Sequence, residues 1–197
     1  MKSFSIANEP IVELKNEKEK EYEFAQISTI GFNADIDAVI SSSSAVKKQL
    51  KDIIAVEQPI TNTLLYKRIA QIWNLSRVTG RLQTMIDSQL TDNYLDPLSD
   101  QQRIYWINES ASKDYHTYRI NSKQDVLDIP IVEVMNAALY IVDQQISMPV
   151  EDLKRLASQV LGFARKGTNV DLATSKAVNL LLENGTLQET NGMISIA

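Results

Sequence analysis

The chain has 197 residues, of which 44% are hydrophobic and 23% are charged, and its formal net charge at pH 7 is −5. This length suits one domain or two small ones, and this balance is typical of a globular protein. The absence of cysteine excludes disulfides, cysteine zinc sites and thiol catalysis, and the single histidine (His116) excludes a two-histidine metal site. The acidic net charge excludes a surface that is basic throughout and binds nucleic acid.

Residues 1–40 form an acidic N-terminal prefix that we expect to be partly flexible, with four basic and eight acidic residues. The charged stretch Lys15–Glu23 indicates a solvated or disordered linker. Phe24–Ile30 has the composition of a short strand. Ser41–Ser44 marks the boundary with the next unit and offers hydroxyl groups for a helix N-cap.

Residues 41–110 are predicted to form a first winged-helix-like unit. A helix with Val46, Leu50 and Ile53 on one face ends before Pro59. A second helix runs from Thr61 or Asn62 to Trp73, and a short turn over Asn74–Ser76 leads to a third. Two short amphipathic helices joined in this way are typical of a helix-turn-helix. Residues 91–102 have the composition of a loop, and Arg103–Ile107 that of a strand.

After a connector over residues 111–129, residues 130–197 are predicted to form a second such unit. Pro130 opens a strongly apolar helix through about Gln145, and further helices follow over Glu151–Leu161 and Thr168–Asn184. Gly185 ends the last helix. Leu187–Thr190 and Met193–Ile196 flank Asn191-Gly192, which indicates a hairpin with a type I′ turn.

An offset of 88 residues relates the two units. It places Leu65 on Leu153, Ile72 on Val160, Leu75 on Phe163, Arg77 on Arg165 and Leu82 on Val170. The alternative is a chance similarity between two amphipathic helix pairs. The similar turn chemistry favours a true repeat, so the expected fold is mostly α (α+β), with tandem winged-helix-like units that carry short β-hairpins.

Short motifs in both halves share a family pattern. They are Glu57-Gln58-Pro59-Ile60, Leu64–Ala70 and Trp73–Arg77, then Tyr118-Arg119, Ile129-Pro130 with Glu133 and Ala137-Ala138, Ser147–Leu153 and Leu161–Arg165. Over about residues 45–190 the chain thereby resembles a domain of unknown function at the C-terminal end of large bacterial superfamily-1 helicase-like proteins, often beside a very-short-patch-repair-like endonuclease domain. The chain departs from the pattern at Thr79 and at Lys166-Gly167-Thr168. The resemblance implies helicase- or nuclease-associated DNA processing, and no particular reaction.

Basic residues concentrate in residues 41–90, which hold seven basic and three acidic residues. In a helix-turn-helix the second helix enters the major groove through its N-terminal residues, and Arg, Lys and hydroxyl groups bind phosphates. The candidates for nucleic-acid binding are Lys67, Arg68, Ser76, Arg77, Thr79, Arg81, Arg165 and Lys166, with Lys47, Lys48, Lys51, Thr168, Asn169 and Lys176 as extensions. Alternatively, Arg77 and Arg165 bind helix carbonyls or an acid of the neighbouring unit. The last hairpin carries Glu189 and no Lys or Arg, which makes it a poor wing for DNA.

Nothing in the sequence indicates catalysis. No stretch has the form GxxxxGK[ST] that cradles nucleotide phosphates. Asp92, Asp96 and Asp100 recur every four residues in the predicted loop, and we interpret them as solvated acids rather than a metal site. His116 lies in a polar connector with no nucleophile nearby. We therefore expect a chain that is not an enzyme and holds no metal or cofactor.

The sequence thus predicts a non-catalytic accessory domain of a helicase- or nuclease-type DNA-processing protein that contacts DNA through the first helix-turn-helix. The alternative is a protein–protein interaction module that never meets nucleic acid. Expected partners are DNA, or helicase and nuclease domains or partner subunits. No apolar run reaches the ~20 residues of a membrane helix, and the first residues have no signal-peptide pattern, so we expect a cytoplasmic protein without a membrane partner.

Overall fold

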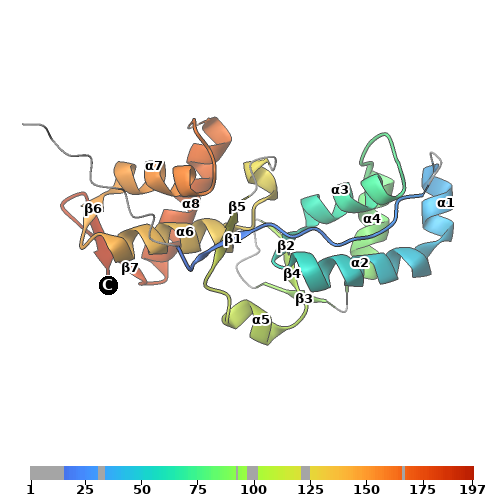
Figure 1. The fold of residues 1–197 in the computed structure, drawn as a ribbon, viewed down its shortest axis with the longest axis horizontal. Coiled ribbons are helices and arrows are strands. Elements are labelled where there is room, and N and C mark those ends of the chain that lie inside the picture. Colours follow the sequence, from blue (N-terminus) through green and yellow to red (C-terminus); the bar gives the residue numbers. More distant parts are fainter. Residues whose placement is uncertain (1–15, 31–33, 92, 97–101, 121–124, 166) are drawn as a thin grey trace, which may run out of the picture.

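The computed structural model describes residues 16–30, 34–91, 93–96, 102–120, 125–165 and 167–197. Within them α-helices dominate and the strands are short, so the expected α+β class with a helical majority is confirmed. Figure 1 shows an elongated molecule with helices α1–α4 at one end and α6–α8 at the other. The strands β1 and β5 lie near the middle.

The first half contains a short helix α1 (Ile36–Ser41), a three-helix unit and a small sheet. Its elements are α2 (Ser43–Glu57), β2 (Ile60–Thr61), α3 (Asn62–Ile72), α4 (Gly80–Gln89), β3 (Tyr94–Leu95) and β4 (Ile104–Trp106). The strands are antiparallel in the order β2-β4-β3. The helix ends follow local chemistry, because Pro59 follows the end of α2 and the hydroxyls of Thr61 and Thr79 accept backbone N–H bonds at the starts of α3 and α4.

The second half repeats this order of elements. It contains α6 (Ile131–Gln144), β6 (Met148–Pro149), α7 (Val150–Val160), α8 (Thr168–Glu183), β7 (Leu187–Thr190) and β8 (Met193–Ile196). The strand order β6-β8-β7 is again antiparallel. The predicted hairpin is confirmed, since Asn191 and Gly192 have φ values of 53° and 78°, as a type I′ turn requires.

Corresponding elements start 88 residues apart. This offset relates Ser43 to Ile131, Ile60 to Met148, Asn62 to Val150, and Gly80 to Thr168. The strands of the two hairpins do not keep the offset, because α8 is longer than α4 and the connection between β3 and β4 is longer than that between β7 and β8. The three helices and the first strand of each unit therefore repeat at one offset, and we call this repeated set of elements the template. The hairpins differ between the units.

Each unit has a hydrophobic core, and the strand β4 contributes to both. The first core contains the apolar stripe Val46, Leu50 and Ile53 of α2 together with Tyr105 of β4. The second core is built on α6 and includes Ile104 and Trp106, the two neighbours of Tyr105. Because successive side chains of a strand point to opposite faces, β4 packs one face against each unit.

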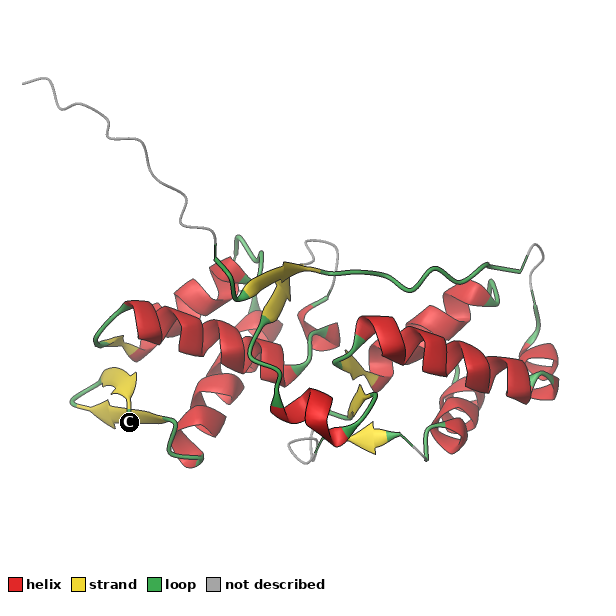
Figure 2. Ribbon diagram, turned by 60° about the horizontal axis from the view of Figure 1, so that its bottom comes forward, coloured by secondary structure: helices red, strands yellow, loops and turns green. Residues whose placement is uncertain are grey.

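Residues between the units and the N-terminal segment complete the middle of the molecule. Here lie α5 (Glu109–Lys113), β5 (Tyr118–Ile120), and a 3-10 turn over Val126–Asp128. The strand β1 (Glu19–Glu21) pairs in parallel with β5, with Glu19 opposite Tyr118. Figure 2 shows the chain leaving β1 as a loop along the first unit toward α1. We call residues 16–30 the strap.

Three expectations for this region are wrong. Phe24–Ile30 is not a strand, because it finds no neighbouring strand among the described residues and instead lies against the first unit, where Ile30 N–H donates to Ile72 O at 2.9 Å. The stretch Lys15–Glu23, expected to be a linker, contains β1; Lys15 itself lies outside the described residues. Ser42 is the N-cap residue of α2, but its hydroxyl makes no capping bond.

In the part of the chain that the structure describes, no helix has both the length and the apolar character needed to cross a membrane.

Candidate functional site

The two basic candidates on α3 are held by acids of the same chain. Arg68 donates from Nε to Glu57 Oε1 at 2.8 Å and from Nη2 to Ala25 O at 2.9 Å, and its guanidinium lies 5.2 Å from the centre of the Phe24 ring. Lys67 pairs with Asp128. Lys67 remains half exposed, whereas Arg68 is largely covered, so α3 offers little free positive charge.

The remaining first-unit candidates lie between α3 and α4 and at the start of α4. Ser76 and Arg77 are exposed, and Arg77 has no ion pair within the described residues. Thr79 is the N-cap of α4, with its hydroxyl accepting from Leu82 N at 3.3 Å. Arg81 is 62% exposed and pairs with Asp37 of α1 at 2.7 Å. Arg77 is therefore the basic side chain of this segment that no internal acid holds.

The second-unit candidates are separate from these. Arg165 is exposed and has no ion pair among the described residues, and Lys166 lies outside them. Thr168 is the first residue of α8, and Asn169 and Lys176 lie farther along that helix. Since α4 and α8 lie at different ends of the molecule (Figure 1), the structure does not bring the two predicted sets together.

The centre of the molecule holds a buried group of charged and aromatic side chains, which we call the junction network: Tyr22, Glu57, Arg68, Arg119 and Glu133. Arg119 of β5 donates from Nε to Glu133 Oε1 of α6 at 2.7 Å and from Nη1 to Glu57 O at 2.8 Å. It also donates to the carbonyl of Pro59. One arginine thus binds the end of α2 in the first unit and the start of α6 in the second.

Glu57 ties the strap to the same place. Its carboxylate accepts from Ala25 N at 3.0 Å and from the hydroxyl of Tyr22 at 2.8 Å, in addition to Arg68. The Tyr22 ring lies over the Arg119 guanidinium, 4.5 Å from its centre. Glu57 is fully buried, but its carboxylate accepts from three donors, and the cation–π pair of Arg119 and Tyr22 lies beside it, so its charge is compensated.

Burial sets the protonation of this network. It raises the pKa of Tyr22 and of Tyr115, and nearby Glu57 and Glu133 add to the effect, so both hydroxyls stay protonated. Burial also raises the pKa of Glu133, and Arg119 opposes it. For Arg119 burial lowers the pKa, but Glu133 and the tyrosines outweigh it, and the net shift is upward. The arginine therefore stays charged.

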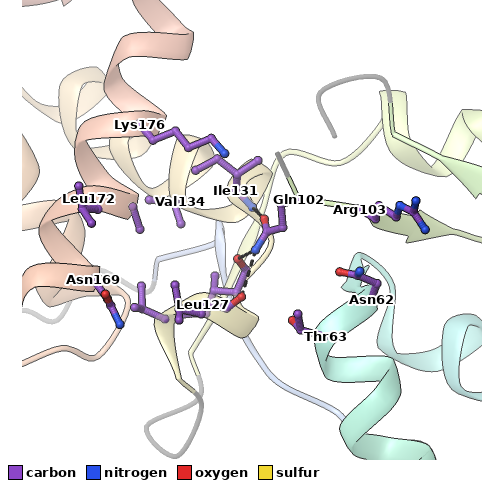
Figure 3. Close-up of a pocket in the computed structure, with 13 residues that line it drawn as sticks. Asn62, Thr63, Gln102, Arg103, Leu127, Ile131, Val134, Asn169, Leu172 and Lys176 are labelled. Atoms are coloured by element: carbon purple, nitrogen blue, oxygen red, sulfur yellow. Dashed lines mark hydrogen bonds between the residues drawn. The ribbon is translucent and has the colours of Figure 1, made fainter. Parts of the chain in front are cut away.

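A groove opens beside this network, between α8 on one side and the starts of α3 and β4 on the other (Figure 3). We call it the junction groove; its volume is about 620 Å³. It is lined by Asn62, Thr63, Gln102, Arg103, Val126, Leu127, Ile129, Ile131, Val134, Asn169, Leu172, Ala173 and Lys176. Gln102 fixes its floor, since its amide donates to the carbonyls of Leu127 and Ile129 and accepts from Ile131 N.

Two residues of this lining, Asn169 and Lys176, are predicted from the sequence for another role, and Leu172 carries a further signal. The buried side of α8 is formed by residues such as Val170, Thr174 and Leu181. Leu172 lies off that stripe and is 62% exposed. A leucine on the polar side of an otherwise amphipathic helix is the signal that could have been used.

The acidic loop residues have a different role from the expected one. Asp96 is buried and accepts from Trp106 Nε1 at 3.0 Å and from the Ser112 hydroxyl at 3.1 Å, so it is not a solvated acid. Asp92 and Asp100 lie outside the described residues. Within the described ranges no group of three or more His, Asp or Glu side chains is placed to hold a metal ion. His116 is exposed between α5 and β5.

Comparison with known proteins gives one match. Residues 40–84 match the model of a family described as a protein of unknown function, DUF3320. The match spans α2, β2, α3 and the first half of α4. No curated protein and no solved structure matches the chain. A match of this extent supports a domain of unknown function in the first unit.

Proposed function

We propose that the chain is a non-catalytic accessory module of a DNA-processing protein, built from two winged-helix-like units. The support for the fold is the order of elements, helix-strand-helix-helix-strand-strand, with the third strand between the other two in both sheets. In this arrangement α4 and α8 correspond to the second helices of the two helix-turn-helix motifs.

The helicase or nuclease setting rests on the motif resemblance. Three of its charged residues, Glu57, Arg119 and Glu133, are buried in the junction network. Side chains that join the two units stabilise the module. The resemblance therefore supports a shared architecture and a shared setting, and carries no reaction with it.

The observation that carries DNA contact is the exposed start of α4. Arg77 is exposed and has no acidic partner among the residues that the structure describes, and Arg81 follows one turn later with most of its side chain in solvent. Second helices of this kind contact DNA through their N-terminal residues, and phosphates favour the N-terminus of a helix. We propose that DNA binds at Ser76, Arg77, Thr79 and Arg81.

A specific observation favours the alternative, a protein–protein interaction module. Lys67, Arg68 and Arg81 are each paired with an acid of the chain, and Asp37 stands beside the start of α4. Each internal pair reduces the positive charge left for phosphates. DNA that binds at the start of α4 must displace Asp37 from Arg81 or make few phosphate contacts, whereas the binding of a protein partner requires neither.

Binding of double-stranded and single-stranded oligonucleotides, measured at several salt concentrations between about 50 and 200 mM, tests the proposal. The double substitution Arg77→Glu with Arg81→Glu is expected to weaken binding and to reduce the salt slope by about two. The control is Arg155→Glu, because Arg155 of α7 is 51% exposed and pairs with Asp152. Unchanged DNA affinity in the double variant overturns DNA contact at α4 and leaves the interaction module.

A further inference from the structure

The junction groove combines two exposed leucines with a polar rim. Leu127, in the 3-10 turn, is 55% exposed and Leu172 of α8 is 62% exposed. Buried apolar side chains of α6, including Ile131 and Val134, lie beneath them in the same lining. Apolar side chains gathered in one concave surface are typical of a binding site, and a volume of about 620 Å³ accommodates several side chains of a ligand.

The charge of the lining has one sign. Among the described residues that line the groove are Arg103 and Lys176 but no Asp or Glu. Arg103 shares its charge with Asp87 at 3.3 Å, and Figure 3 shows its guanidinium turned away from the groove. Lys176 has no ion pair within the described residues, and Figure 3 shows it extending from α8 across the side of the groove near Ile131. Burial lowers the pKa of Lys176, so a carboxylate beside it would strengthen its charged form.

We propose that the junction groove binds a short amphipathic segment of a partner protein, with apolar side chains against Leu127 and Leu172 and an Asp or Glu carboxylate on Lys176. The apolar wall and the all-positive lining are complementary to such a segment. Duplex DNA suits the groove less well, since one free lysine neutralises few phosphates and Leu172 occupies the exposed face of α8. The proposal is independent of DNA contact at α4.

Selection from a displayed library of random peptides on the full chain tests the proposal without a known ligand. We expect enrichment of peptides that combine Leu, Ile or Phe with Asp or Glu. For synthetic copies, Leu172→Glu is expected to weaken binding about tenfold or more, and Lys176→Gln several-fold. Peptides in which Lys replaces each acid are expected to lose binding. The control is Ile146→Glu, which adds the same charge in place of a side chain that is 98% exposed outside the groove.

Four results overturn the proposal: no enrichment, enriched peptides without acids, equal binding to the Leu172→Glu variant, and loss of an oligonucleotide complex or of a dimer in that variant. Loss of the oligonucleotide complex assigns the groove to nucleic acid, and loss of the dimer assigns it to a second copy of the chain. Circular dichroism confirms that each variant is folded. Arg77→Glu with Arg81→Glu leaves peptide binding unchanged, so failure of this proposal and failure of DNA contact at α4 are separate outcomes.

Discussion

The turn after α2 and the turn after α6 occupy equivalent places in the two units but have opposite surroundings. Glu57 and Gln145, Gln58 and Ile146 are each 88 positions apart. Glu57 is fully buried and the carbonyls beside it are bound by Arg119, whereas Ile146 is 98% exposed. Turns at equivalent places in the sequence therefore serve as the junction in one unit and as exposed surface in the other.

The repeated elements join the units through β4, but the turn after α2 becomes part of the junction only through further residues. At this turn the contacts come from outside the template: from the Arg119 side chain of β5, the Tyr22 hydroxyl and the backbone N–H of Ala25. Substitutions at the equivalent turns should therefore have unequal effects. The largest effect is expected where a single residue binds both units.

Arg119→Met is expected to have the largest effect, lowering the free energy of unfolding by about 3–5 kcal/mol. The substitution leaves Glu133 buried without its cation and removes the donor to the carbonyls of Glu57 and Pro59. Urea unfolding followed by tryptophan fluorescence measures the loss. Arg155→Met serves as the control, because its ion pair is exposed and its removal should cost no more than about 1 kcal/mol. Equal losses in the two variants would contradict a junction centred on Arg119.

Glu57→Gln and Gln145→Glu exchange side chains at equivalent positions and test the comparison directly. Glu57→Gln is expected to cost about 2–3 kcal/mol, because the neutral amide satisfies Arg68, Tyr22 and Ala25 poorly. Gln145→Glu should change stability by no more than about 1 kcal/mol, through its unfavourable place at a helix C-terminus. Similar costs at both positions would show that the two turns do not differ as described.

The smallest effect is expected from pH, through the strap. The pKa of Tyr22 is raised above 10, chiefly by burial, so the folded chain keeps this proton after the unfolded chain has lost it. Stability is then complete below about pH 10 and falls above it by ~1.4 kcal/mol per pH unit for each such tyrosine.

Urea unfolding at pH values on either side of about 10 measures this slope. Tyr22→Phe should reduce the slope of stability against pH by the contribution of one tyrosine, ~1.4 kcal/mol per pH unit. Phe24→Leu is the control, because it alters the neighbouring strap ring without removing an ionisable group, and should keep the slope. A slope unaffected by Tyr22→Phe would mean that this hydroxyl is not held in the folded state.

Sequence periodicity predicted the helices well because their buried stripes and stops are local. Pro59 and Gly185 mark the ends of α2 and α8, and Asn191-Gly192 marks the hairpin turn, each within a few residues of its own position. The structure adds α1 and β1. β1 is exposed and leaves no apolar pattern, whereas α1 has Ile36, Val39 and Ile40 at helical spacing but only six residues in which to show it.

The candidate site was harder to predict because its chemistry depends on residues far apart in the chain. Arg68 and Lys67 have the sequence features of phosphate-binding residues, and only the fold reveals that Glu57 and Asp128 hold them. A weak signal existed for the buried acids. Glu57 continues the apolar stripe of α2, and Glu133 lies in the most apolar helix, so each is a charged residue on a face that should be buried.

The strand β4 has a consequence for how the molecule can be divided. Tyr105 packs in one core, while Ile104 and Trp106 pack in the other. A cut between β4 and α6 therefore leaves a fragment in which Ile104 and Trp106 are exposed to solvent. The other fragment loses part of its interior. Recombinant halves of this protein should therefore aggregate or require each other for solubility, and expression boundaries should keep both units on one polypeptide.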